Sequence, residues 1–417
     1  MNRTSQEFCA VILFALTVSG QFVPLCAAEK ERDPLELEIL FWESRVGRDP
    51  ADPMTPEKLG QAYLQKSRES GDLTYLTKAV ASLEDSIKIK PKNPSAMNWL
   101  ALAFIQQHRF KEALALAEKS VKLLPEDGFA YGLLGDANLE LGDMDKAEAG
   151  YVRAMELAPE MFSLARWANL QFMRGDIPAA LKFYKEACLD AKTHGRTPFN
   201  AAWCALQLGQ TYFRIGKFDE AEAQYQIALN TLPGNYMPLD YLAELRGAQE
   251  RYDESIALYE KALAIAHRPE LCQALGDVLF IAQKSEQSAE LHKQAVDLYL
   301  EAVNQGHALY YHHLAGFYCD SKKSPPDAVR WARRDLDLRK SVYAHDCLAW
   351  ALYQNGDFKE ARDEMKKALS AGTLDAHLFN HASLIYFRAG DVAGSRDALR
   401  KAAELNPQYN KFHAHRN

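Results

Sequence analysis

The richest group of side chains that could do chemistry lies in the stretch QGHALYYHH, which holds His307, His312 and His313. Cys319 follows closely, and His345 could approach from a later element. Imidazole and thiolate groups are common ligands of zinc. His312 and His313 are adjacent, however, so on a helix they point about 100° apart and cannot easily share one ion. A metal-dependent activity near His312 is therefore kept only as the enzyme alternative for this chain.

Other catalytic signals are missing. The sequence has no HExxH, GxSxG, Walker or GxGxxG motif, and Asp335 and Asp337 form a lone DxD pair that is typical of a solvated helix face. Outside the N-terminal segment, the cysteines are widely spaced and include no CxxC pair. They are Cys188, Cys204, Cys272, Cys319 and Cys347. We therefore expect no catalysis, cofactor or metal site, and we expect these cysteines to be buried as small apolar residues rather than joined in a disulfide framework.

The elements that must position these side chains are indicated by small residues that recur along most of the chain. They are Ala79, Ala113, Ala147, Ala180, Ala221, Ser255, Ala295, Ala328, Ala361 and Ser395, and seven of the nine intervals are 33 or 34 residues. In most copies a larger residue, such as Tyr151, follows after four residues and another small one, such as Ala154, after seven. Steps of four and seven fall on one helix face, so each repeat should contain a helix with a small–large–small stripe.

Each repeat also contains a first helix and a turn. Segments such as LGQTYF have helical spacing, and turns such as ELGDMDKA contain a glycine that can end the first helix at positive φ. Proline at the end of several repeats, as at Pro159, stops the second helix. Two repeats have about seven additional residues, which predicts longer helices. Asp335 stands where a small residue belongs, which indicates that the register over 308–341 is displaced by one residue. A functional buried carboxylate is the alternative.

These positions resemble the tetratricopeptide repeat family. The resemblance also depends on Leu-Gly or Leu-Ala pairs in the first helix, as at Leu134-Gly135 and Leu208-Gly209, and it covers residues 53–409 in about ten copies. It implies an all-α fold, a right-handed α-solenoid of stacked antiparallel helix pairs. It also implies a concave groove, formed mainly by the first helices, that binds a peptide segment or a helix of a partner protein.

The groove-facing positions of that family, transferred onto this chain, give a set of aromatic, arginine and polar residues. They are Phe129, Arg166, Arg174, Trp203, Gln210, Phe213, Arg214, Phe280, His312, Tyr343, Trp350, Tyr353, Phe387 and Arg388. Aromatic side chains with interspersed arginine are typical of protein-binding surfaces. One branch of the family binds C-terminal carboxylates with a Lys/Asn/Arg clamp. Only Arg166 fits that clamp fully, so the activity is not assigned.

The N-terminal segment indicates export. Arg3 precedes an uncharged stretch from Phe8 to Ala28, and Cys26 and Ala27 supply small residues before a charged segment. This pattern predicts a secretory signal peptide at residues 1–28. Because the uncharged stretch is about as long as a membrane span, an uncleaved membrane anchor is the alternative.

The two ends of the repeat array are expected to differ. Residues 29–52 would form a linker and a short amphipathic cap. The cap residues that would cover the first repeat are Leu37, Leu40, Phe41 and Trp42. After Pro407 only ten residues remain, which is too few for a polar cap. We therefore expect a flexible tail at 410–417, and either fraying of the last helix or self-association through the C-terminal repeat.

The bulk composition limits the class of partner. The 417 residues have a formal net charge of −7 and contain no run of Lys and Arg, which argues against a nucleic-acid partner. We predict an exported, periplasmic or secreted, scaffold or adaptor without catalysis that binds a protein or peptide and no membrane once the signal is cleaved. The first alternative is a binding subunit of a cell-envelope enzyme or export complex. The second, from the enzyme class, is the metal-dependent activity near His312.

Overall fold

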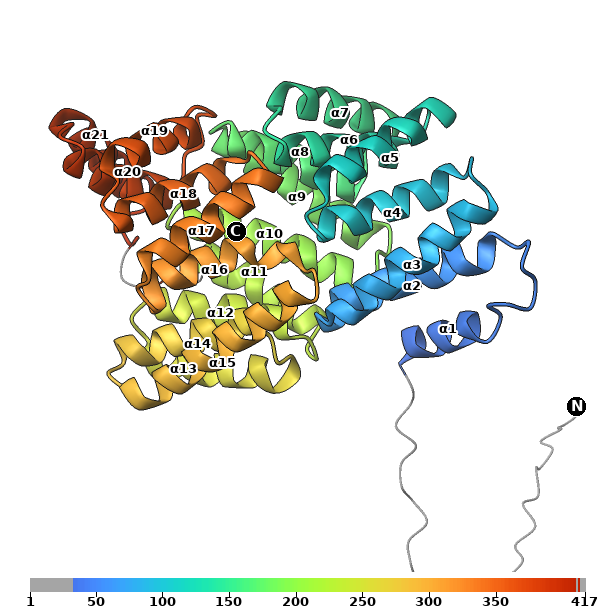
Figure 1. Cartoon of the computed structure of the whole chain (residues 1–417), viewed down its shortest axis with the longest axis horizontal. Helices are drawn as coiled ribbons and strands as arrows, with labels where there is room; N and C mark the ends of the chain where they lie inside the picture. Colours follow the sequence, from blue (N-terminus) through green and yellow to red (C-terminus); the bar gives the residue numbers. More distant parts are fainter. Residues whose placement is uncertain (1–32, 410–411, 413–417) are drawn as a thin grey trace, which may run out of the picture.

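The computed structural model describes residues 33–409 and residue 412, and their regular structure is helical throughout. A short helix, α1 (Pro34–Glu43), precedes ten antiparallel helix pairs (Figure 1). The first five pairs are α2 (Met54–Ser70) with α3 (Leu73–Ile89), α4 (Pro94–Gln106) with α5 (Phe110–Leu123), α6 (Gly128–Glu140) with α7 (Met144–Leu157), α8 (Met161–Met173) with α9 (Ile177–Thr193), and α10 (Pro198–Arg214) with α11 (Phe218–Thr231). Four later pairs are α12 (Tyr236–Ala248) with α13 (Tyr252–Ile265), α14 (Pro269–Ile281) with α15 (Ser285–Asn304), α18 (Val342–Asn355) with α19 (Phe358–Leu369), and α20 (Ala376–Arg388) with α21 (Val392–Leu405). The predicted all-α solenoid is confirmed, whereas the predicted signal peptide lies outside the described residues.

The remaining pair, eighth in order, is irregular. Its first arm is divided into the 3₁₀ turn η1 (Ala308–Tyr310), the short helix α16 (Tyr311–Gly316) and the π-helical turn η2 (Phe317–Ser321), and its second arm is α17 (Pro325–Leu338). The two repeats with additional residues have longer helices, as predicted. Helices α2 and α3 have 17 residues each, and α15 has 20.

The small–large–small stripe forms the core of each pair. Ala147, Tyr151 and Ala154 are almost completely buried, and so are their counterparts in most other pairs. A Cβ atom added to Gly135 on the first helix would lie less than 3.0 Å from the ring of Tyr151. Tyr151 therefore fills the space that Gly135 leaves, and the two helices approach closely because that side chain is missing.

The predicted register shift around Asp335 was wrong. Ala328, Ala332 and Asp335 are all fully buried at the three stripe positions of α17. The carboxylate is tolerated there because Arg339 Nε lies 3.0 Å from its Oδ1 and His312 Nδ1 lies 3.2 Å from its Oδ2. Buried charges require this kind of compensation. The repeat thus keeps its period and replaces one small residue by an ion-paired acid.

The turn inside each pair needs one residue at positive φ. Glycine supplies it in several pairs, for example Gly142 (φ 87°) and Gly216 (φ 73°), as predicted. In other pairs the same place is occupied by His108, Glu250 or Gln283, with φ between 59° and 61°. Since the left-handed region is unfavourable for residues with a Cβ atom, the stacking of the helices must stabilise these turns.

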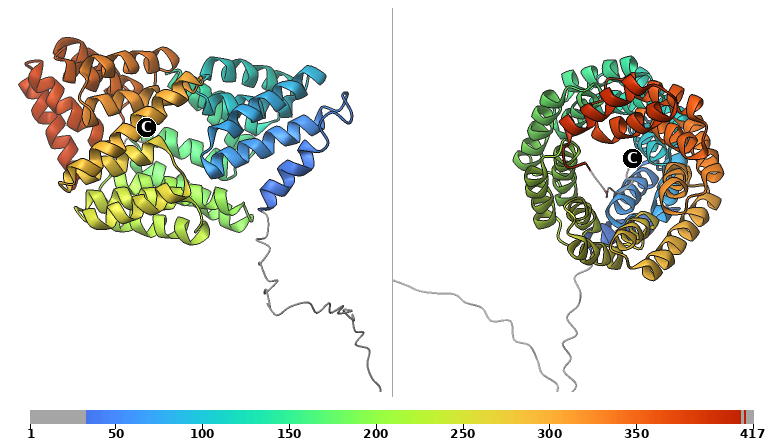
Figure 2. Two further views of the ribbon diagram at one scale, coloured as in Figure 1. Left: turned by 60° about the horizontal axis from the view of Figure 1, so that its bottom comes forward. Right: turned by 90° about the vertical axis from the view of Figure 1, so that its left-hand side faces the viewer.

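The pairs stack with their first helices toward the inside of the curve. Helix α4 contacts α6, α6 contacts α8, α10 contacts α12, and α18 contacts α20. Viewed from the end, the pairs are arranged around a ring (Figure 2, right). The first helices therefore form what we call the inner wall.

The second turn of this superhelix packs directly on the first. The Lys340 amide donates to the Glu140 carbonyl oxygen (2.7 Å), and the Thr373 hydroxyl donates to the Met173 carbonyl oxygen (2.6 Å). Thr373 and Met173 are 200 residues apart, which is about six repeats. The array therefore closes one superhelical turn within about six repeats, and its loops touch across the turns.

The contacts between superhelical turns follow one rule. Glycines in the pair turns of the first superhelical turn lie against the junctions between later repeats. These contacts are Gly71 with Arg268, Gly142 with Lys340, Gly175 with Gly372, and Gly216 with Asn406. In the second superhelical turn, a Cβ atom added to Gly356 or Gly390 would meet nothing within 4 Å. In the first superhelical turn the tertiary contact leaves no room for a Cβ atom, so glycine is required there. In the second superhelical turn glycine is favoured only because the backbone has a positive φ.

The N-terminal cap uses a different face of its helix than the sequence suggested. Leu35 and Ile39 of α1 are buried against the first pair, whereas Leu37, Leu40 and Phe41 are each about half exposed. Of the predicted cap residues, Trp42 alone packs on that core. The reason is electrostatic as well as apolar. Lys66 on α2 forms ion pairs with Asp33 (2.9 Å) and Glu36 (2.8 Å), and these contacts fix the rotation of α1.

The C-terminal segment returns to the inside of the molecule. Helix α21 is complete to Leu405, the Asn406 side chain donates to the Phe213 carbonyl oxygen (3.4 Å), and the Tyr409 hydroxyl lies 2.9 Å from His377 Nδ1. Phe412, the one described residue of the predicted tail, is buried against Gly247 of α12. The rest of that tail lies outside the described residues.

Candidate binding site

Most of the predicted groove residues lie on the inner wall and contact other residues of the same chain. The Arg166 guanidinium lies 5.9 Å from the Phe129 ring centroid, and its Nε forms an ion pair with Asp136 (2.8 Å). Arg174 pairs in the same way with Glu148 (2.8 Å). Both arginine charges are therefore already compensated, which reduces what each can add to a contact with a partner.

Other predicted residues are divided between the core and the surface. Phe213 is buried and stacks on Phe218 at 5.3 Å, so it belongs to the core. Trp203 is half-buried, 6.4 Å from the ring of Phe162. In contrast, Phe280 is 63% exposed and Phe387 is 61% exposed. Both phenylalanine side chains are therefore accessible to a partner, and neither belongs to the core.

Arg388 follows Phe387 at the end of α20. Its guanidinium sits 4.2 Å from the ring centroid of Phe358, which is a cation–π contact between α20 and α19. Trp350 and Tyr353 stack on each other on α18, with centroids 4.9 Å apart. The predicted groove residues therefore do not form one continuous binding surface, because many of them are engaged in aromatic pairs and ion pairs within the chain.

Three predicted residues, Gln210, Arg214 and Tyr343, do converge on one cavity. It has a volume of about 210 Å³ and lies where the inner wall of the first superhelical turn meets the second. Its lining consists of Leu139, Glu140, Asn169, Phe172, Met173, Tyr184, Gln207, Gln210, Thr211, Arg214, Arg339, Ser341 and Tyr343. We call it the inter-turn cavity. It brings together residues from α6, α8, α9, α10, the α17–α18 junction and the start of α18, which no local sequence pattern could place side by side.

The inter-turn cavity is rich in hydrogen-bond donors. Arg214 Nη1 donates to the Tyr343 hydroxyl (2.8 Å), and that hydroxyl donates to Asp375 Oδ2 (3.0 Å). Arg339 Nη2 and the Ser341 hydroxyl are buried and have no hydrogen-bond partner. Two arginines and one glutamate line the cavity, and Asp335 and Asp375 lie against the arginines from outside the lining. Buried donors without acceptors are costly, so this lining favours a ligand group that accepts hydrogen bonds, above all a carboxylate.

The charges around Arg339 are strongly coupled. Burial alone would lower the pKa of Arg339, but the carboxylates of Asp335 and Glu140 raise it above its ordinary value. Burial would raise the pKa of Asp335, yet Arg339 and His312 hold it well below the usual range. The guanidinium is therefore a permanent cation at the cavity, and Asp335 stays ionised beside it.

The histidine-rich segment does not assemble a metal site at His312. Its ring is occupied with Asp335, and the arginine beside that carboxylate would repel a cation. His313 has a buried Nδ1 without a partner, and burial lowers the pKa of its imidazole to about 4, so it is neutral at physiological pH. Within residues 33–409 and 412, three metal-capable side chains meet at Asp346, His377 and His381 instead.

Sequence reasoning missed Arg339, Ser341 and this histidine–aspartate group. Histidines at positions 377 and 381, four residues apart on one helix, were a usable signal for a shared face. Nothing in the sequence indicated that Arg339 would meet residues from repeats about six copies earlier.

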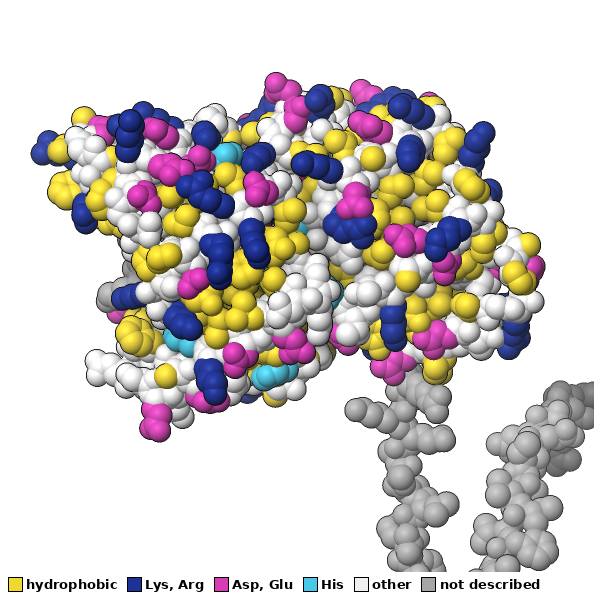
Figure 3. Space-filling model, viewed as in Figure 1, with side chains coloured by type: hydrophobic (Ala, Val, Ile, Leu, Met, Phe, Trp, Pro, Cys, Tyr) yellow, Lys and Arg dark blue, Asp and Glu magenta, His cyan; other side chains and the backbone are white. Residues whose placement is uncertain are grey.

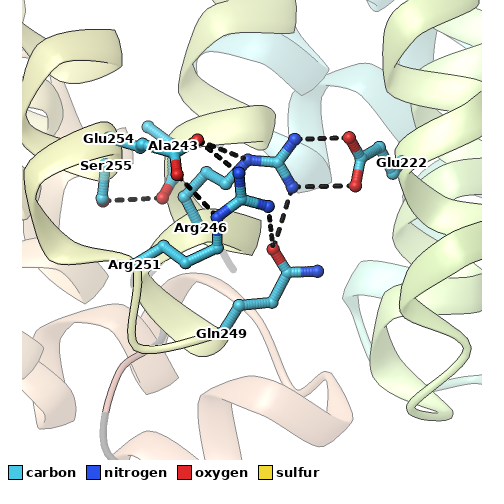
Figure 4. Close-up of polar contacts among 7 residues, drawn as sticks. All are labelled: Glu222, Ala243, Arg246, Gln249, Arg251, Glu254 and Ser255. Atoms are coloured by element: carbon cyan, nitrogen blue, oxygen red, sulfur yellow. Dashed lines mark hydrogen bonds and ion pairs between the residues drawn. The ribbon is translucent and has the colours of Figure 1, made fainter.

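Arg246, another arginine of the inner wall, bridges two neighbouring repeats, and Arg251 forms an ion pair within its own repeat. Arg246 on α12 pairs with Glu222 on α11 (Nη1 to Oε2, 2.8 Å) and with Gln249 (2.8 Å), while Arg251 pairs with Glu254 (Figure 4). On the face shown in Figure 3, cationic and anionic side chains are interspersed without a patch of one sign.

The described cysteines agree with burial rather than with a disulfide framework. Cys204, Cys272, Cys319 and Cys347 are buried free thiols, and Cys188 is half-buried with its Sγ 3.2 Å from that of Cys204. Among residues 33–409 and 412, no helix combines the length and the apolar character needed to cross a membrane.

Comparison with family models gives repeated matches along the chain. Two models described as "Tetratricopeptide repeat" match, one at residues 160–233 and the other at residues 75–128, 100–162, 206–268 and 348–410. Together these segments cover more than half of the chain.

Among curated proteins, the chain is similar to the Hsp70-Hsp90 organizing protein of Triticum aestivum, with 37% identity over 81 residues. That match covers 19% of this chain and 14% of the relative. It is also similar to tetratricopeptide repeat protein 37 of Xenopus laevis, with 26% identity over 259 residues, 61% of this chain and 16% of the relative. The chain thus matches less than a fifth of the length of these two relatives.

Solved structures with related helix arrangements include a human IFIT1 dimer with PPP-AAAA, at 16% identity and a TM-score of 0.40, which covers 85% of this chain and 73% of that one. Another is Pseudomonas aeruginosa pilF, at 16% identity and a TM-score of 0.40, which covers 49% of this chain and 91% of that one. A tetratricopeptide repeat protein of Parabacteroides merdae has 18% identity and a TM-score of 0.40, and the match covers 57% of this chain and 93% of that one.

Proposed function

The chain belongs to the tetratricopeptide repeat family, and from this we propose that it is an adaptor that binds a protein or peptide partner along its inner wall. Repeat arrays of this kind present extended concave surfaces suited to protein–protein interaction. The observation that supports the proposal most is the inter-turn cavity, where Arg339 and Ser341 offer donors without partners.

The chemistry of the inter-turn cavity suggests what the partner contributes. A carboxylate from an acidic side chain or a chain terminus would accept from Arg339 Nη2 and the Ser341 hydroxyl, the two buried donors of the lining that have no partner. Exposed aromatic residues such as Phe280 would add apolar contact area outside the cavity. We therefore propose an acidic peptide segment as the bound element.

The test combines affinity purification with one isosteric substitution. The full chain is used to capture partners from the envelope fraction of its source, and their affinity is then measured. Gln210→Glu adds a negative charge to the cavity and keeps the acceptor for the Tyr225 hydroxyl (3.3 Å). We expect it to weaken partner binding about tenfold or more, the effect of about 1.4 kcal/mol.

Gln226→Glu is the matched control, because Gln226 is exposed on the second helix α11 and faces away from the cavity lining. It should leave partner binding unchanged. Equal binding by the Gln210→Glu variant and the wild type, at preserved helicity, would contradict a carboxylate in the inter-turn cavity.

We also propose that the protein is exported, on the strength of the apolar stretch from Phe8 to Ala28 and the small residues at its end. Expression with the native N-terminus should yield a mature chain that begins at Glu29, measurable by mass spectrometry of the purified protein. A chain that retains residues 1–28 and stays in the membrane pellet would favour the uncleaved anchor instead.

Self-association through the last pair is a further part of the proposal. Leu399 takes the stripe position of Tyr151 but is 58% exposed, because no described helix follows α21 to cover it. Phe387 and Val392 are exposed on the same pair. Leu399→Glu should reduce the sedimentation coefficient of a dimer to that of a monomer, whereas Leu189→Glu, at an exposed leucine of α9, should not. A wild-type chain that is monomeric at high concentration would exclude this association.

A further inference from the structure

Three side chains with metal-binding atoms meet on the inner wall near the C-terminal end. Asp346 belongs to α18, and His377 and His381 belong to α20. His381 Nδ1 lies 3.0 Å from Asp346 Oδ1, and His377 Nε2 lies 3.3 Å from Asp346 Oδ2. The three ligand atoms are all within 4.8 Å of one another. We call these residues the His–His–Asp group.

The repeat architecture explains why they meet. Positions 377 and 381 are four residues apart, so their side chains project from the same face of α20. Asp346 occupies the first helix of the preceding pair, and α18 contacts α20 directly. A carboxylate and an i, i+4 histidine pair on two neighbouring helices can therefore converge on one point.

Both imidazole rings are held in place by surrounding residues. Trp350 stacks on His381, with centroids 4.0 Å apart and the planes nearly parallel, and Trp350 Nε1 donates to Asp320 Oδ1 (3.0 Å). The Tyr409 hydroxyl lies 2.9 Å from His377 Nδ1, the nitrogen that faces away from Asp346. Metal-binding histidines are commonly oriented in this way through their second nitrogen.

The group differs from the other histidine–carboxylate pairs in the described chain. His292–Asp277 (2.8 Å) and His345–Glu364 (2.7 Å) each have one imidazole, and Glu364 also has Lys367 at 2.7 Å. The pairs of His194 with Asp190 and of His312 with Asp335 also have one imidazole, and each of those carboxylates has an arginine at ion-pair distance. Asp346 has two imidazoles and, among the described residues, no Lys or Arg at ion-pair distance. It is nonetheless only 4% exposed. A buried carboxylate in this setting lacks a full positive countercharge, which a metal ion would supply.

We propose that Asp346, His377 and His381 bind a divalent transition-metal ion of the Zn²⁺ class. Zinc binds imidazole nitrogen and carboxylate oxygen at about 2.0–2.2 Å, so the ligand atoms of one tetrahedral ion lie about 3.3 Å apart. Asp346 Oδ2 lies 3.2 Å from His381 Nδ1 and 3.3 Å from His377 Nε2, and both distances match that edge. Two nitrogen ligands disfavour Mg²⁺ and Ca²⁺, which prefer oxygen.

The bound ion would act as a staple at the end of the array. It would join α18 to α20, and through the Tyr409 contact on His377 it would also fix the C-terminal segment inside the superhelix. Since an ion that binds only the folded chain stabilises it, the site would strengthen the pair that no described helix covers. The proposal does not depend on the identity of the protein partner.

The test uses the full chain purified without a histidine tag and stripped of metal by a chelator. Titration with Zn²⁺, followed by isothermal calorimetry, should show one site per chain, and Co²⁺ should give the visible absorption of a tetrahedral site. Asp346→Asn and His381→Asn should each weaken Zn²⁺ binding by more than about 100-fold, which exceeds the loss expected for an outer partner. Tyr409→Phe, which removes only such a partner, should weaken it by about 10-fold.

Controls keep the result interpretable. His345→Asn removes an imidazole from the same helix α18 but not from the His–His–Asp group, and the double variant His413→Ala, His415→Ala removes the histidines near the end of the sequence. Both should bind Zn²⁺ as the wild type does. His377→Gln alters the most exposed member of the group, so it keeps the test valid if a buried variant fails to fold. Absence of stoichiometric binding by the wild type, or equal binding by a folded Asp346→Asn or His377→Gln variant, would overturn the proposal.

Discussion

At the scale of single residues, the buried charge of Asp335 has the clearest consequence. The carboxylate occupies a stripe position that is otherwise small, and Arg339 compensates it at 3.0 Å. Asp335→Ala would leave the buried guanidinium with only Glu140 at 3.5 Å. We expect the free energy of unfolding, measured by chemical denaturation, to fall by about 3–5 kcal/mol.

Asp337→Ala is the control, since Asp337 is exposed on the same helix and its loss should change stability by less than about 0.5 kcal/mol.

The stability that Asp335 contributes should depend on pH in a definite direction. The pKa of Asp335 is depressed in the folded state, so its contribution is complete above the unfolded value of about 4 and is lost as pH falls below it. The stability difference between wild type and Asp335→Ala should therefore narrow below about pH 4. A constant difference down to pH 2 would contradict the ion pair.

At the scale of the helix pair, the contact between Gly135 and Tyr151 decides how closely two helices pack. Alanine is the better helix former by about 1 kcal/mol, so propensity alone predicts that Gly135→Ala stabilises. We expect the opposite, a loss of about 1–3 kcal/mol, because the added Cβ atom would overlap the tyrosine ring.

A double-mutant cycle separates the two effects. The second pair of the chain already has Ala101 and Ala117 at these two positions, and both are fully buried. Gly135→Ala combined with Tyr151→Ala recreates that arrangement, so the double variant should be less destabilised than the sum of the single variants. Strict additivity would show that the glycine is not required for packing.

At the scale of the whole molecule, the second superhelical turn rests on the glycine turns of the first. Gly175 and Gly390 have nearly the same φ, 79° and 84°, but an added Cβ atom at Gly175 would overlap the Gly372 carbonyl oxygen, whereas at Gly390 it would meet open space. Both alanine variants carry the strain of positive φ, about 1–2 kcal/mol. Only Gly175→Ala should also loosen the contact between turns and increase the radius of gyration measured by small-angle X-ray scattering. If both variants keep the wild-type radius, the contact between turns does not determine the compactness of the superhelix.

The sequence by itself determined the repeat, its helix pairs and its register. Ala147, Tyr151 and Ala154 record packing between residues that are close in sequence, and such packing imposes a period that can be read directly. The same period also indicated the longer helices and the glycine turns. The predicted register shift at Asp335 was wrong, because a charged residue can replace a small one where a partner on the next turn of the helix compensates it.

Only the tertiary structure decided the pitch of the superhelix, and with it the candidate sites. The inter-turn cavity joins Gln210 and Arg214 to Arg339 and Ser341, more than a hundred residues away, and the His–His–Asp group depends on how α18 lies against α20. These contacts arise from the small rotation between successive pairs, added over about six repeats. The residue types do not record that rotation in any periodic pattern. The sequence therefore identified the class of protein and the helices of the inner wall, and the structure decided where on the inner wall a partner or an ion can bind.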